Sequence, residues 1–234
     1  MIIAGIQKHT LIDYPGKIAC IVFLAGCNFR CPWCYSSELV LPLKIAKQPR
    51  FSDQEFFNFL KERQGLLDGV VVCGGEPTIN KDLPKFIEKI KSYGFFVKLD
   101  TNGSNPEMLK DLVMAKLIDY VAMDIKGIGI YEPILGEGIK LEHIKESVEF
   151  LKKGLVDFEF RTTCVPTIHK KEDFIEIAKW IGGQNVKYYL QNFVASDGKI
   201  IDPEFEKVRP FENKFLEEII AQICPYFKEV KLRA

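Results

Sequence analysis

Six short apolar segments alternate with amphipathic segments along this chain, and this alternation limits the possible fold more than any other feature. The apolar segments are rich in β-branched and aromatic residues, as strands buried on both faces of a parallel sheet are. They lie at 18–24, 70–73, 97–100, 120–124, 158–163 and 186–191. Strand–helix units in this number indicate one α/β domain. The pattern leaves open whether the sheet is an open doubly wound sheet or a barrel.

The intervening segments have the periodicity and the capping residues of helices. Ser52, followed three residues later by Glu55, predicts a capping box at the start of a helix that extends to about Arg63. Further helices are predicted over about 81–93, 106–115, 142–153, 171–180 and 211–223, with an edge strand over about 229–232. The longest loops are predicted at 41–51 and 127–141, and the second contains four glycines.

The length and composition fit one globular domain. A chain of 234 residues with 47% hydrophobic residues is large enough for a substantial core. We find no linker or repeat that would divide it. We therefore predict a single domain over 1–234, with a core at about 14–195 and a C-terminal helix and edge strand within 203–234.

Charge and cysteine usage bear on partners and location. Lys+Arg and Asp+Glu are both 32, so bulk charge gives no support for a nucleic-acid or membrane partner. The N-terminus lacks the features of a signal peptide, and no apolar stretch approaches the length of a membrane span. These features predict a cytoplasmic protein. An odd number of cysteines, seven, then indicates metal or redox chemistry rather than disulfides.

Three of the cysteines, Cys27, Cys31 and Cys34, follow one another at spacings of four and three residues. A 4Fe–4S cluster normally takes four cysteine ligands, so three thiolates would leave one iron open to a small molecule. The same spacing places side chains on one face of a helix, but Pro32 disfavours a helix here. Structural zinc prefers four protein ligands, and no second cysteine pair follows. We favour a cluster over zinc, and zinc over inert core cysteines.

The motif CxxxCxxC resembles the cluster motif of the radical S-adenosylmethionine superfamily. Its flanking sequence, 10–19 and 23–34, is similar to activating proteins of anaerobic ribonucleoside-triphosphate reductase, a branch of the glycyl-radical-enzyme activases. The close match covers about a fifth of the chain, and weaker matches continue to about residue 195. The resemblance implies a partial (β/α)6 TIM-like barrel of parallel strands, a 4Fe–4S cluster and S-adenosylmethionine as cofactors.

Reactive residues in parallel α/β folds gather at the C-terminal ends of strands. The second predicted strand ends in Gly74-Gly75-Glu76. By itself this is a Gly-Gly turn, but two glycines also permit positive φ and close approach of a ligand to backbone amides. The resemblance implies that this element holds the ammonium group of the methionine moiety.

The next two predicted strands end in Asp100-Thr101-Asn102 and in Asp124-Ile125-Lys126. Each reads as an ordinary loop when taken alone. The resemblance implies that Thr101 and Asn102 lie near the ribose and methionine parts, with Asp124 at the same rim, and that Lys126 neutralises the methionine carboxylate. Asp100, Thr101 and Asp124 match residues that hold a monovalent cation in pyruvate formate-lyase activase. A bound sodium or potassium ion is therefore a further candidate.

Three candidates have an equally simple structural reading. The resemblance places Trp33 at an aromatic position whose backbone contacts the adenine amine, Val165 against the adenine ring, and Gln191 in hydrogen-bonding reach of it. Packing within the protein explains each equally well. Arg161 is predicted to belong to an ion pair. The remaining cysteines are predicted to be core residues rather than ligands of an auxiliary cluster: Cys20, Cys73, Cys164 and Cys224.

The implied activity is reductive cleavage of S-adenosylmethionine to a 5′-deoxyadenosyl radical, which abstracts hydrogen from a glycine of the anaerobic reductase. Flavodoxin or ferredoxin would be the electron donor. Two alternatives stay open: a small-molecule radical enzyme similar to 7-carboxy-7-deazaguanine synthase, and a non-enzymatic electron carrier. The element Asp13-Tyr14-Pro15-Gly16, similar to Asp-Gly-Pro-Gly of activases, favours the first reading.

The candidate catalytic residues are Asp13, Tyr35 and Lys126. The chain departs from the activases directly after the third cysteine, where Tyr35-Ser36 replaces their usual His-Asn. A phenol donates hydrogen bonds but does not titrate near neutral pH as an imidazole does. We therefore predict that Tyr35 shapes the approach of the partner and takes no part in proton transfer.

Overall fold

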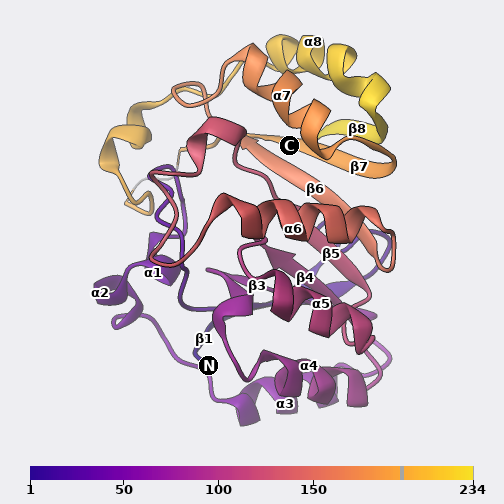
Figure 1. Ribbon diagram of the computed structural model, residues 1–234. Coiled ribbons are helices and arrows are strands. Elements are labelled where there is room, and N and C mark those ends of the chain that lie inside the picture. The colour runs from indigo at the N-terminus through magenta and orange to yellow at the C-terminus, as the bar shows by residue number, and fades with distance from the viewer. Residues whose placement is uncertain (196–197, 234) are drawn as a thin grey trace. The chain divides into compact units, whose positions relative to one another are not determined.

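The computed structural model describes residues 1–195 and 198–233, and Figure 1 shows the path of the chain. The residues form two compact units. The first contains Met1–Asn28, Ser36–Thr101 and Asn105–Val121, and the second contains the remaining residues. Eight strands follow one another in the sheet in chain order, from β1 to β8. The α/β class with parallel strands, predicted from the sequence, is confirmed.

The first unit is built on the strands that precede the cysteines and on the three strands that follow. Its strands are β1 (Ile3–Thr10), β2 (Ala19–Leu24), β3 (Gly69–Gly74), β4 (Phe96–Thr101) and the start of β5 (Tyr120–Asp124). β1 pairs antiparallel with β2, whereas β2, β3 and β4 pair in parallel. Its helices are α1 (Ser37–Val40), α2 (Pro42–Ile45), α3 (Asp53–Glu62), α4 (Leu83–Ser92) and α5 (Pro106–Met114), with a 3-10 turn at Pro77–Ile79.

Aromatic side chains hold α3 and α4 together on one side of these strands. The rings of Phe56 and Phe86 stack at 5.4 Å with an interplanar angle of 21°, and both side chains are buried. The predicted capping box starts α3, because Ser52 N donates to Glu55 Oε2 at 2.7 Å and Glu55 N donates to Ser52 Oγ at 3.2 Å. That prediction is confirmed.

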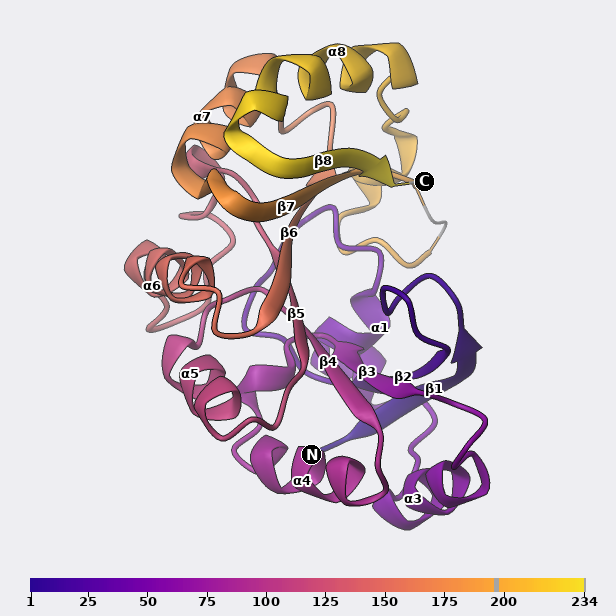
Figure 2. The same cartoon turned by 90° about the vertical axis from the view of Figure 1, so that its right-hand side faces the viewer.

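The second unit contains the end of β5 and the C-terminal strands and helices. Its strands are β6 (Asp157–Cys164), β7 (Gly183–Asn192) and β8 (Phe227–Arg233), and its helices are α6 (Leu141–Lys152), α7 (Lys171–Ile181) and α8 (Asn213–Ile223). Short 3-10 turns lie at Ile128–Ile130, Pro203–Lys207 and Cys224–Tyr226. β6, β7 and β8 pair in parallel, and α7 and α8 lie on one side of them (Figure 2).

The side chains of β6 and β7 explain why helices cover one face of this part of the sheet. Phe160 and Tyr188 are register partners and are fully buried. The alternate positions carry Arg161 and Tyr189, which are also register partners. Because successive side chains point to opposite faces, one face is apolar and the other carries polar groups.

The sequence analysis did not predict β1, α1 or α2 of the first unit. β1 was not predicted, because Gly5 and the exposed run Gln7–His9 interrupt the alternation of a half-buried strand, and its pairing with β2 is irregular in register. The predicted loop 41–51 contains α2, which begins at Pro42, a residue suited to the first helical position. The single-domain prediction stays a prediction.

The predicted core cysteines differ in their surroundings. Cys20 and Cys164 are fully buried, as predicted, and burial raises the pKa of Cys20 to about 12. Cys73 is partly buried. The prediction for Cys224 is wrong, because this residue is exposed. It follows the last residue of α8, where Pro225 turns the chain, so it no longer belongs to the buried face of the helix.

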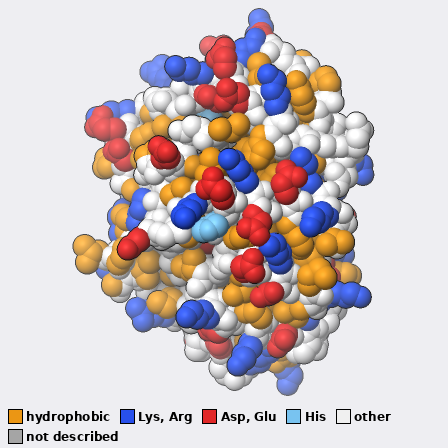
Figure 3. Space-filling view, in the orientation of Figure 1, with side chains coloured by type: hydrophobic (Ala, Val, Ile, Leu, Met, Phe, Trp, Pro, Cys, Tyr) orange, Lys and Arg blue, Asp and Glu red, His pale blue; other side chains and the backbone are white. Residues whose placement is uncertain are grey.

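Two surface properties bear on partners. No helix within the described residues is long and apolar enough to cross a membrane. On the face shown in Figure 3, acidic and basic side chains are interspersed among hydrophobic ones rather than gathered by sign.

Thiol alkylation should separate these cysteines. In folded protein under anaerobic conditions, iodoacetamide should modify Cys224 readily, because the reagent can reach an exposed thiol. Cys20 and Cys164 should react only after denaturation. Peptide mapping by mass spectrometry reads each site, and denatured protein provides the control. Equal labelling of Cys20 and Cys224 in folded protein would contradict the assigned burial.

Candidate functional site

In the first unit, the end of β3 lies directly against the start of the cysteine loop. At Gly75, a Cβ atom would stand 2.0 Å from the carbonyl oxygen of Gly26 and 3.1 Å from Cβ of Cys27. At Gly74, where φ is +135°, a Cβ atom would stand 2.1 Å from Leu24 O. Real Cβ contacts are not this short, so glycine is required at both positions.

Backbone hydrogen bonds fix the same contact. Gly75 N donates to Leu24 O at 2.9 Å, and Glu76 N donates to Gly26 O at 2.8 Å. The close approach that the glycines permit is therefore made with the chain that leads into Cys27. The two glycines position the first predicted cluster ligand.

Glu76 is buried, with 1% of its surface exposed, and hydroxyl groups hold its carboxylate. Its Oε1 atom accepts hydrogen bonds from Thr78 N at 3.1 Å, Thr78 Oγ1 at 2.6 Å and Thr101 Oγ1 at 2.7 Å. Thr101 ends β4, so two neighbouring strand ends fix the orientation of this carboxylate. The sequence prediction included Thr101 but missed Thr78, which lies in an unremarkable Pro-Thr turn.

A partly buried carboxylate of the first unit is paired with a buried lysine. Lys98 and Asp100 lie two residues apart on β4, and Lys98 Nζ lies 2.5 Å from Asp100 Oδ1. The exposed fraction of the Lys98 side chain is 1% and that of Asp100 is 12%. Lys98 carries no signal in the sequence, because lysine in a strand is normally solvent-exposed.

Asp13 lies in the turn between β1 and β2. Thr10 Oγ1 donates to Asp13 Oδ2 and accepts from the backbone N–H groups of Ile12 and Asp13, each at 3.3 Å. These bonds hold the Asp13 carboxylate at the turn. Leu11 and Ile12 beside it are 72% and 81% exposed.

In the second unit, the segment 29–35 carries Cys31 and Cys34 and is held by two other segments. On one side, Arg30 N donates to Ile134 O at 2.9 Å and Phe29 forms a bridge with Leu135. The ring of Phe29 also meets Tyr131 edge-on at 6.3 Å. The glycine-containing segment predicted as a long loop thus supports the cysteine loop.

The segment that follows residue 198 supports the other side. Asp202 N donates to Pro32 O and Ile201 N donates to Cys34 O, both at 3.0 Å. The Trp33 ring lies 6.3 Å from that of Phe205 and is 4% exposed. The side chain of Trp33 is therefore a packing aromatic, while its backbone stays a candidate contact for the adenine.

Burial raises the pKa of Cys31 to about 11, although the nearby charge of Lys126 acts in the opposite direction. Thiolate ligation requires loss of that proton, so metal binding here would release it. Within residues 1–195 and 198–233, no three His, Cys, Asp or Glu side chains converge to hold one metal ion. A cluster cube differs, since each thiolate binds its own iron.

Asp124 lies between two cationic side chains of the second unit. Arg161 Nε is 3.0 Å from Oδ1, and Lys126 Nζ is 3.3 Å from Oδ2. Burial works against ionisation of Asp124, but the charges of Arg161 and Lys126 outweigh it and hold the pKa below its usual value. Burial likewise disfavours charged Lys126, but Asp124 and Cys31 raise its pKa above the usual range. The predicted ion-pair role of Arg161 is confirmed.

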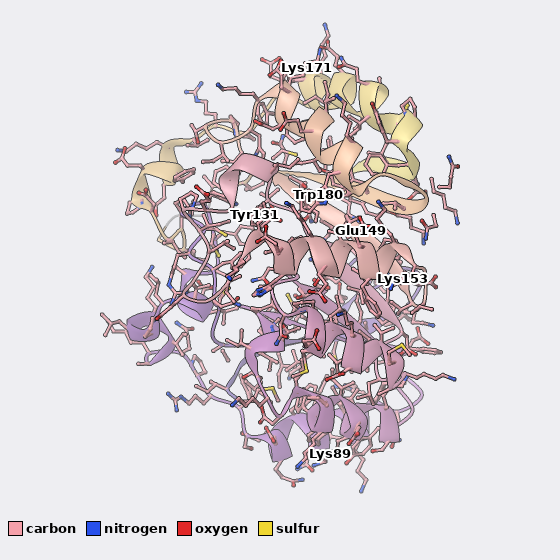
Figure 4. The ribbon with its side chains drawn as sticks, viewed as in Figure 1. Lys89, Tyr131, Glu149, Lys153, Lys171 and Trp180 are labelled. Atoms are coloured by element: carbon pink, nitrogen blue, oxygen red, sulfur yellow. The ribbon has the colours of Figure 1, made fainter. Side chains whose placement is uncertain are left out.

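Two buried side chains fix the backbone of Lys126. The hydroxyl of Tyr131 accepts from Lys126 N at 3.0 Å, and its ring packs edge-on against Trp180 at 6.5 Å (Figure 4). His169 Nδ1 accepts from Val165 N at 3.0 Å, so Nε2 carries the proton and donates to Lys126 O at 2.8 Å. His169 therefore links two predicted cofactor-binding residues. Because His169 lies 43 residues from Lys126 in the sequence, this supporting role could not be predicted from the sequence.

The remaining candidates have these places. Asn102 accepts from Ser104 N at 2.9 Å in the second unit. Val165 is fully buried, and Gln191 is partly buried on β7. Tyr35 is 55% exposed.

The site residues divide between the units. The first unit brings Cys27 together with Gly74, Gly75, Glu76 and Thr101, and the second brings Cys31 together with Asp124 and Lys126. Of the predicted cation ligands, Asp100 and Thr101 belong to the first unit and Asp124 to the second, and each carboxylate is paired with a side-chain cation of its own unit.

Comparison with known proteins adds an independent finding. Residues 21–181 match the model of the Radical SAM superfamily. The chain is 37% identical over 226 residues to a protein of Methanocaldococcus jannaschii named "Putative glycyl-radical enzyme activating enzyme", covering 92% of this chain and 89% of that one. It is 28% identical over 156 residues to the 7-carboxy-7-deazaguanine synthase of Thermococcus kodakarensis, covering 59% of this chain and 60% of that one.

A solved structure shows the same fold. Streptococcus suis SuiB bound to S-adenosylmethionine superposes with a TM-score of 0.64 at 12% identity, covering 92% of this chain and 52% of SuiB. SuiB bound to the precursor peptide SuiA gives a TM-score of 0.67. The chain thus spans about half the length of SuiB, and at this identity the likeness concerns the fold alone.

Replacing Gly75 with Ala should displace the cysteine loop, because the new Cβ would overlap the Gly26 carbonyl. We expect a loss of about 1–3 kcal/mol in the free energy of unfolding of the cofactor-free protein. Gly129→Ala is the matched control, since its Cβ would meet open space and its φ is ordinary. Chemical denaturation measures both. Equal stability of the two variants would contradict the contact.

His169 should make the protein less stable in mild acid. Burial lowers the pKa of His169, so the folded state keeps it neutral while the unfolded chain gains a proton below about pH 6.5. The contribution of neutral His169 to the free energy of unfolding is therefore fully present above that pH. Below it, the free energy of unfolding falls by at most about 1.4 kcal/mol per pH unit. Denaturation at several pH values should show a flatter dependence for His169→Gln than for wild type or the His9→Gln control. An unchanged slope in His169→Gln would exclude this residue.

Proposed function

Because the chain belongs to the radical S-adenosylmethionine superfamily, we propose that Cys27, Cys31 and Cys34 hold a 4Fe–4S cluster. The fit of the residues supports this. Gly75 lets β3 reach the loop that leads to Cys27, and two segments of the second unit grip the loop that carries Cys31 and Cys34. With three protein thiolates, one iron is left for S-adenosylmethionine.

When bound, the cluster supplies the electron for cleavage of S-adenosylmethionine to a 5′-deoxyadenosyl radical. The chain's own residues bind and orient that cofactor. The carboxylate of Glu76, whose Oε1 atom accepts hydrogen bonds from two threonines, accepts a hydrogen bond from the ammonium group of the methionine moiety. Lys126 meets its carboxylate, with its backbone fixed by Tyr131 and His169. We assign to the ribose and methionine parts the residues Thr101, Asn102 and Asp124. We assign to the adenine the backbone of Trp33 and the side chains of Val165 and Gln191.

We further propose that the substrate is a glycine of a glycyl-radical protein, specifically an anaerobic ribonucleoside-triphosphate reductase. The 37% identity over most of both chains to the Methanocaldococcus protein supports a glycyl-radical protein as substrate. The reductase is proposed from the similarity of residues 10–19 and 23–34 to its activating proteins. The Asp13 turn suits a protein partner, because Leu11 and Ile12 present exposed aliphatic surface beside a fixed carboxylate. Tyr35 is also exposed, and we assign it to the surface that the partner protein approaches. Flavodoxin or ferredoxin is proposed as electron donor.

A small-molecule reaction is the second candidate. The identity to 7-carboxy-7-deazaguanine synthase favours it, although that match covers 59% of the chain against 92% for the activating enzyme. A third candidate, an electron carrier without catalysis, gains nothing from an iron that lacks a fourth protein ligand.

One anaerobic experiment separates these candidates. Reconstituted protein is reduced with dithionite, mixed with S-adenosylmethionine and anaerobic ribonucleotide reductase, and examined by electron paramagnetic resonance and chromatography. The proposal predicts 5′-deoxyadenosine and a glycyl radical on the reductase. Asp13→Asn and the double variant Leu11→Ser, Ile12→Ser should lower the yield of glycyl radical, but they should not lower cleavage of S-adenosylmethionine in the absence of the reductase. The control Leu66→Ser, at another exposed leucine, should change neither the radical yield nor the cleavage. Cleavage without a glycyl radical would reject this partner, and no cleavage would indicate a carrier.

Replacing Glu76 with Gln should weaken binding of S-adenosylmethionine about ten- to a hundred-fold, because a charge-assisted hydrogen bond contributes about 1.5–3 kcal/mol. Cluster assembly should persist, since the backbone of residue 76 still bonds Gly26. Equilibrium dialysis measures affinity, and iron and sulfide analysis measures the cluster. Glu62→Gln on the exposed end of α3 is the control. Unaltered affinity in Glu76→Gln would remove this carboxylate from the site.

A further inference from the structure

Helix α2 and the residues that follow it, 42–50, form a basic segment that the proposed reaction does not use. The segment contains Lys44, Lys47 and Arg50 and no acidic residue, whereas the whole chain has equal numbers of acidic and basic residues, 32 of each. Lys44 Nζ donates to Ser37 Oγ at 2.8 Å. Lys47 and Arg50 are exposed, and within residues 1–195 and 198–233 neither side chain makes a hydrogen bond or an ion pair. The charges of these two residues are therefore available to a partner.

Contacts within the first unit place this segment beside the chain that enters the cysteine loop. Ile45 of α2 packs against a small apolar cluster that contains Ala25 and Leu39. The carbonyl oxygen of Leu39 accepts a hydrogen bond from Gly26 N at 2.7 Å. Gly26 directly precedes Cys27, the first proposed cluster ligand. The basic segment is therefore anchored next to this ligand.

An exposed apolar side chain accompanies the cations. Leu43 is 83% exposed, although Ile45 on the same short helix is partly buried. Figure 1 shows α2 beside α1, which follows the cysteine loop in the chain. We call the exposed residues Leu43, Lys47 and Arg50 the α2 surface. Apolar and cationic side chains together suit a partner whose apolar contact area has acidic groups around it.

The proposed reaction requires a protein that can meet this description. Each cleavage of S-adenosylmethionine consumes one electron, and the donor protein has to dock near the cluster that receives it. Of the two donors named above, flavodoxin exposes the apolar edge of a flavin ring, which Leu43 can contact. An acidic surface around that edge would be attracted by Lys47 and Arg50, and such attraction steers association.

We propose that the α2 surface binds an acidic face of flavodoxin and directs its flavin toward the loop that carries Cys27. The inference rests on the proposed function, since only a protein with a reducible cluster needs this donor. In the step that follows docking, the reduced flavin loses one electron and the cluster gains it. No bond forms or breaks, and no further oxidant or reductant is required. Lys47 and Arg50 are docking residues and do not contact the reacting atoms.

The test measures binding of oxidised flavodoxin to the reconstituted protein by isothermal titration calorimetry at low and high ionic strength. Lys47→Glu, Arg50→Glu should raise the dissociation constant about tenfold, because two exposed attractions become repulsions. High ionic strength should weaken binding of wild type and reduce that difference, since salt screens exposed charges. Leu43→Ser should weaken binding about threefold at both ionic strengths, because an apolar contact is not screened.

The charge-matched control is Lys61→Glu, Lys85→Glu, at exposed positions of α3 and α4. It changes the net charge by the same amount and should leave the affinity for flavodoxin within about twofold of wild type. Cleavage of S-adenosylmethionine with dithionite as reductant should be equal in wild type and all variants. With a low concentration of reduced flavodoxin instead, cleavage should be slower only in the variants at Leu43 or at Lys47 and Arg50.

Each outcome decides the question. Unchanged affinity in Lys47→Glu, Arg50→Glu, an equal loss in the control, or no binding by wild type would overturn the proposal. A loss of ferredoxin binding without a loss of flavodoxin binding would overturn it too. If the double variant does not fold, Lys47→Gln, Arg50→Gln decides, with an expected loss of about threefold. If wild type with dithionite does not cleave S-adenosylmethionine, the proposed function fails, while calorimetry still decides whether this surface binds flavodoxin.

Discussion

The contact between the end of β3 and the chain entering the cysteine loop is the constraint on which the first unit's part of the site depends. A Cβ atom at position 75 would lie only 2.0 Å from the carbonyl oxygen of Gly26, so only glycine allows this approach. The next amide, that of Glu76, donates a hydrogen bond to the same carbonyl. The same short segment therefore places a cysteine and a carboxylate together. Thr78 and Thr101 then fix the carboxylate, so three strand ends contribute to one arrangement.

Charge compensation is the second organising feature, and ion pairs within each unit contribute to it. In the first, Lys98 neutralises Asp100. In the second, Asp124 lies between Arg161 and Lys126, and Glu159, fully buried, is paired through both oxygens with Arg233 at 2.5 and 2.8 Å. Each of these ion pairs offsets part of the cost of removing its charges from water.

The sequence was most informative where structure follows from local pattern. Parallel strands, the α3 capping box and the polar residues at strand ends follow from periodicity and from turn chemistry. β1 was missed because its residues Gln7–His9 are polar and its pairing is irregular. Cys224 was misplaced because apolar neighbours in the sequence suggest burial, whereas this residue lies just beyond the end of α8 and is exposed.

The supporting residues of the site could not be found this way. Lys98 looks like a surface lysine until its 1% exposure is known. His169 lies 43 residues from Lys126, and Tyr131 supports that same backbone from within a glycine-containing loop. Such contacts are set by the packing of distant segments, which one sequence without structure does not specify. The resemblance named the candidate ligands, while the structure supplied the groups that hold them.

The account depends most on one claim, that three thiolates hold a 4Fe–4S cluster with an iron open to S-adenosylmethionine. Electron paramagnetic resonance of the reduced, reconstituted protein before and after adding S-adenosylmethionine tests it most directly. The account predicts a cluster signal whose shape changes when the cofactor is added, and loss of that signal when Cys27, Cys31 or Cys34 is replaced by Ala. A signal unaffected by S-adenosylmethionine, or one that survives all three replacements, would contradict it.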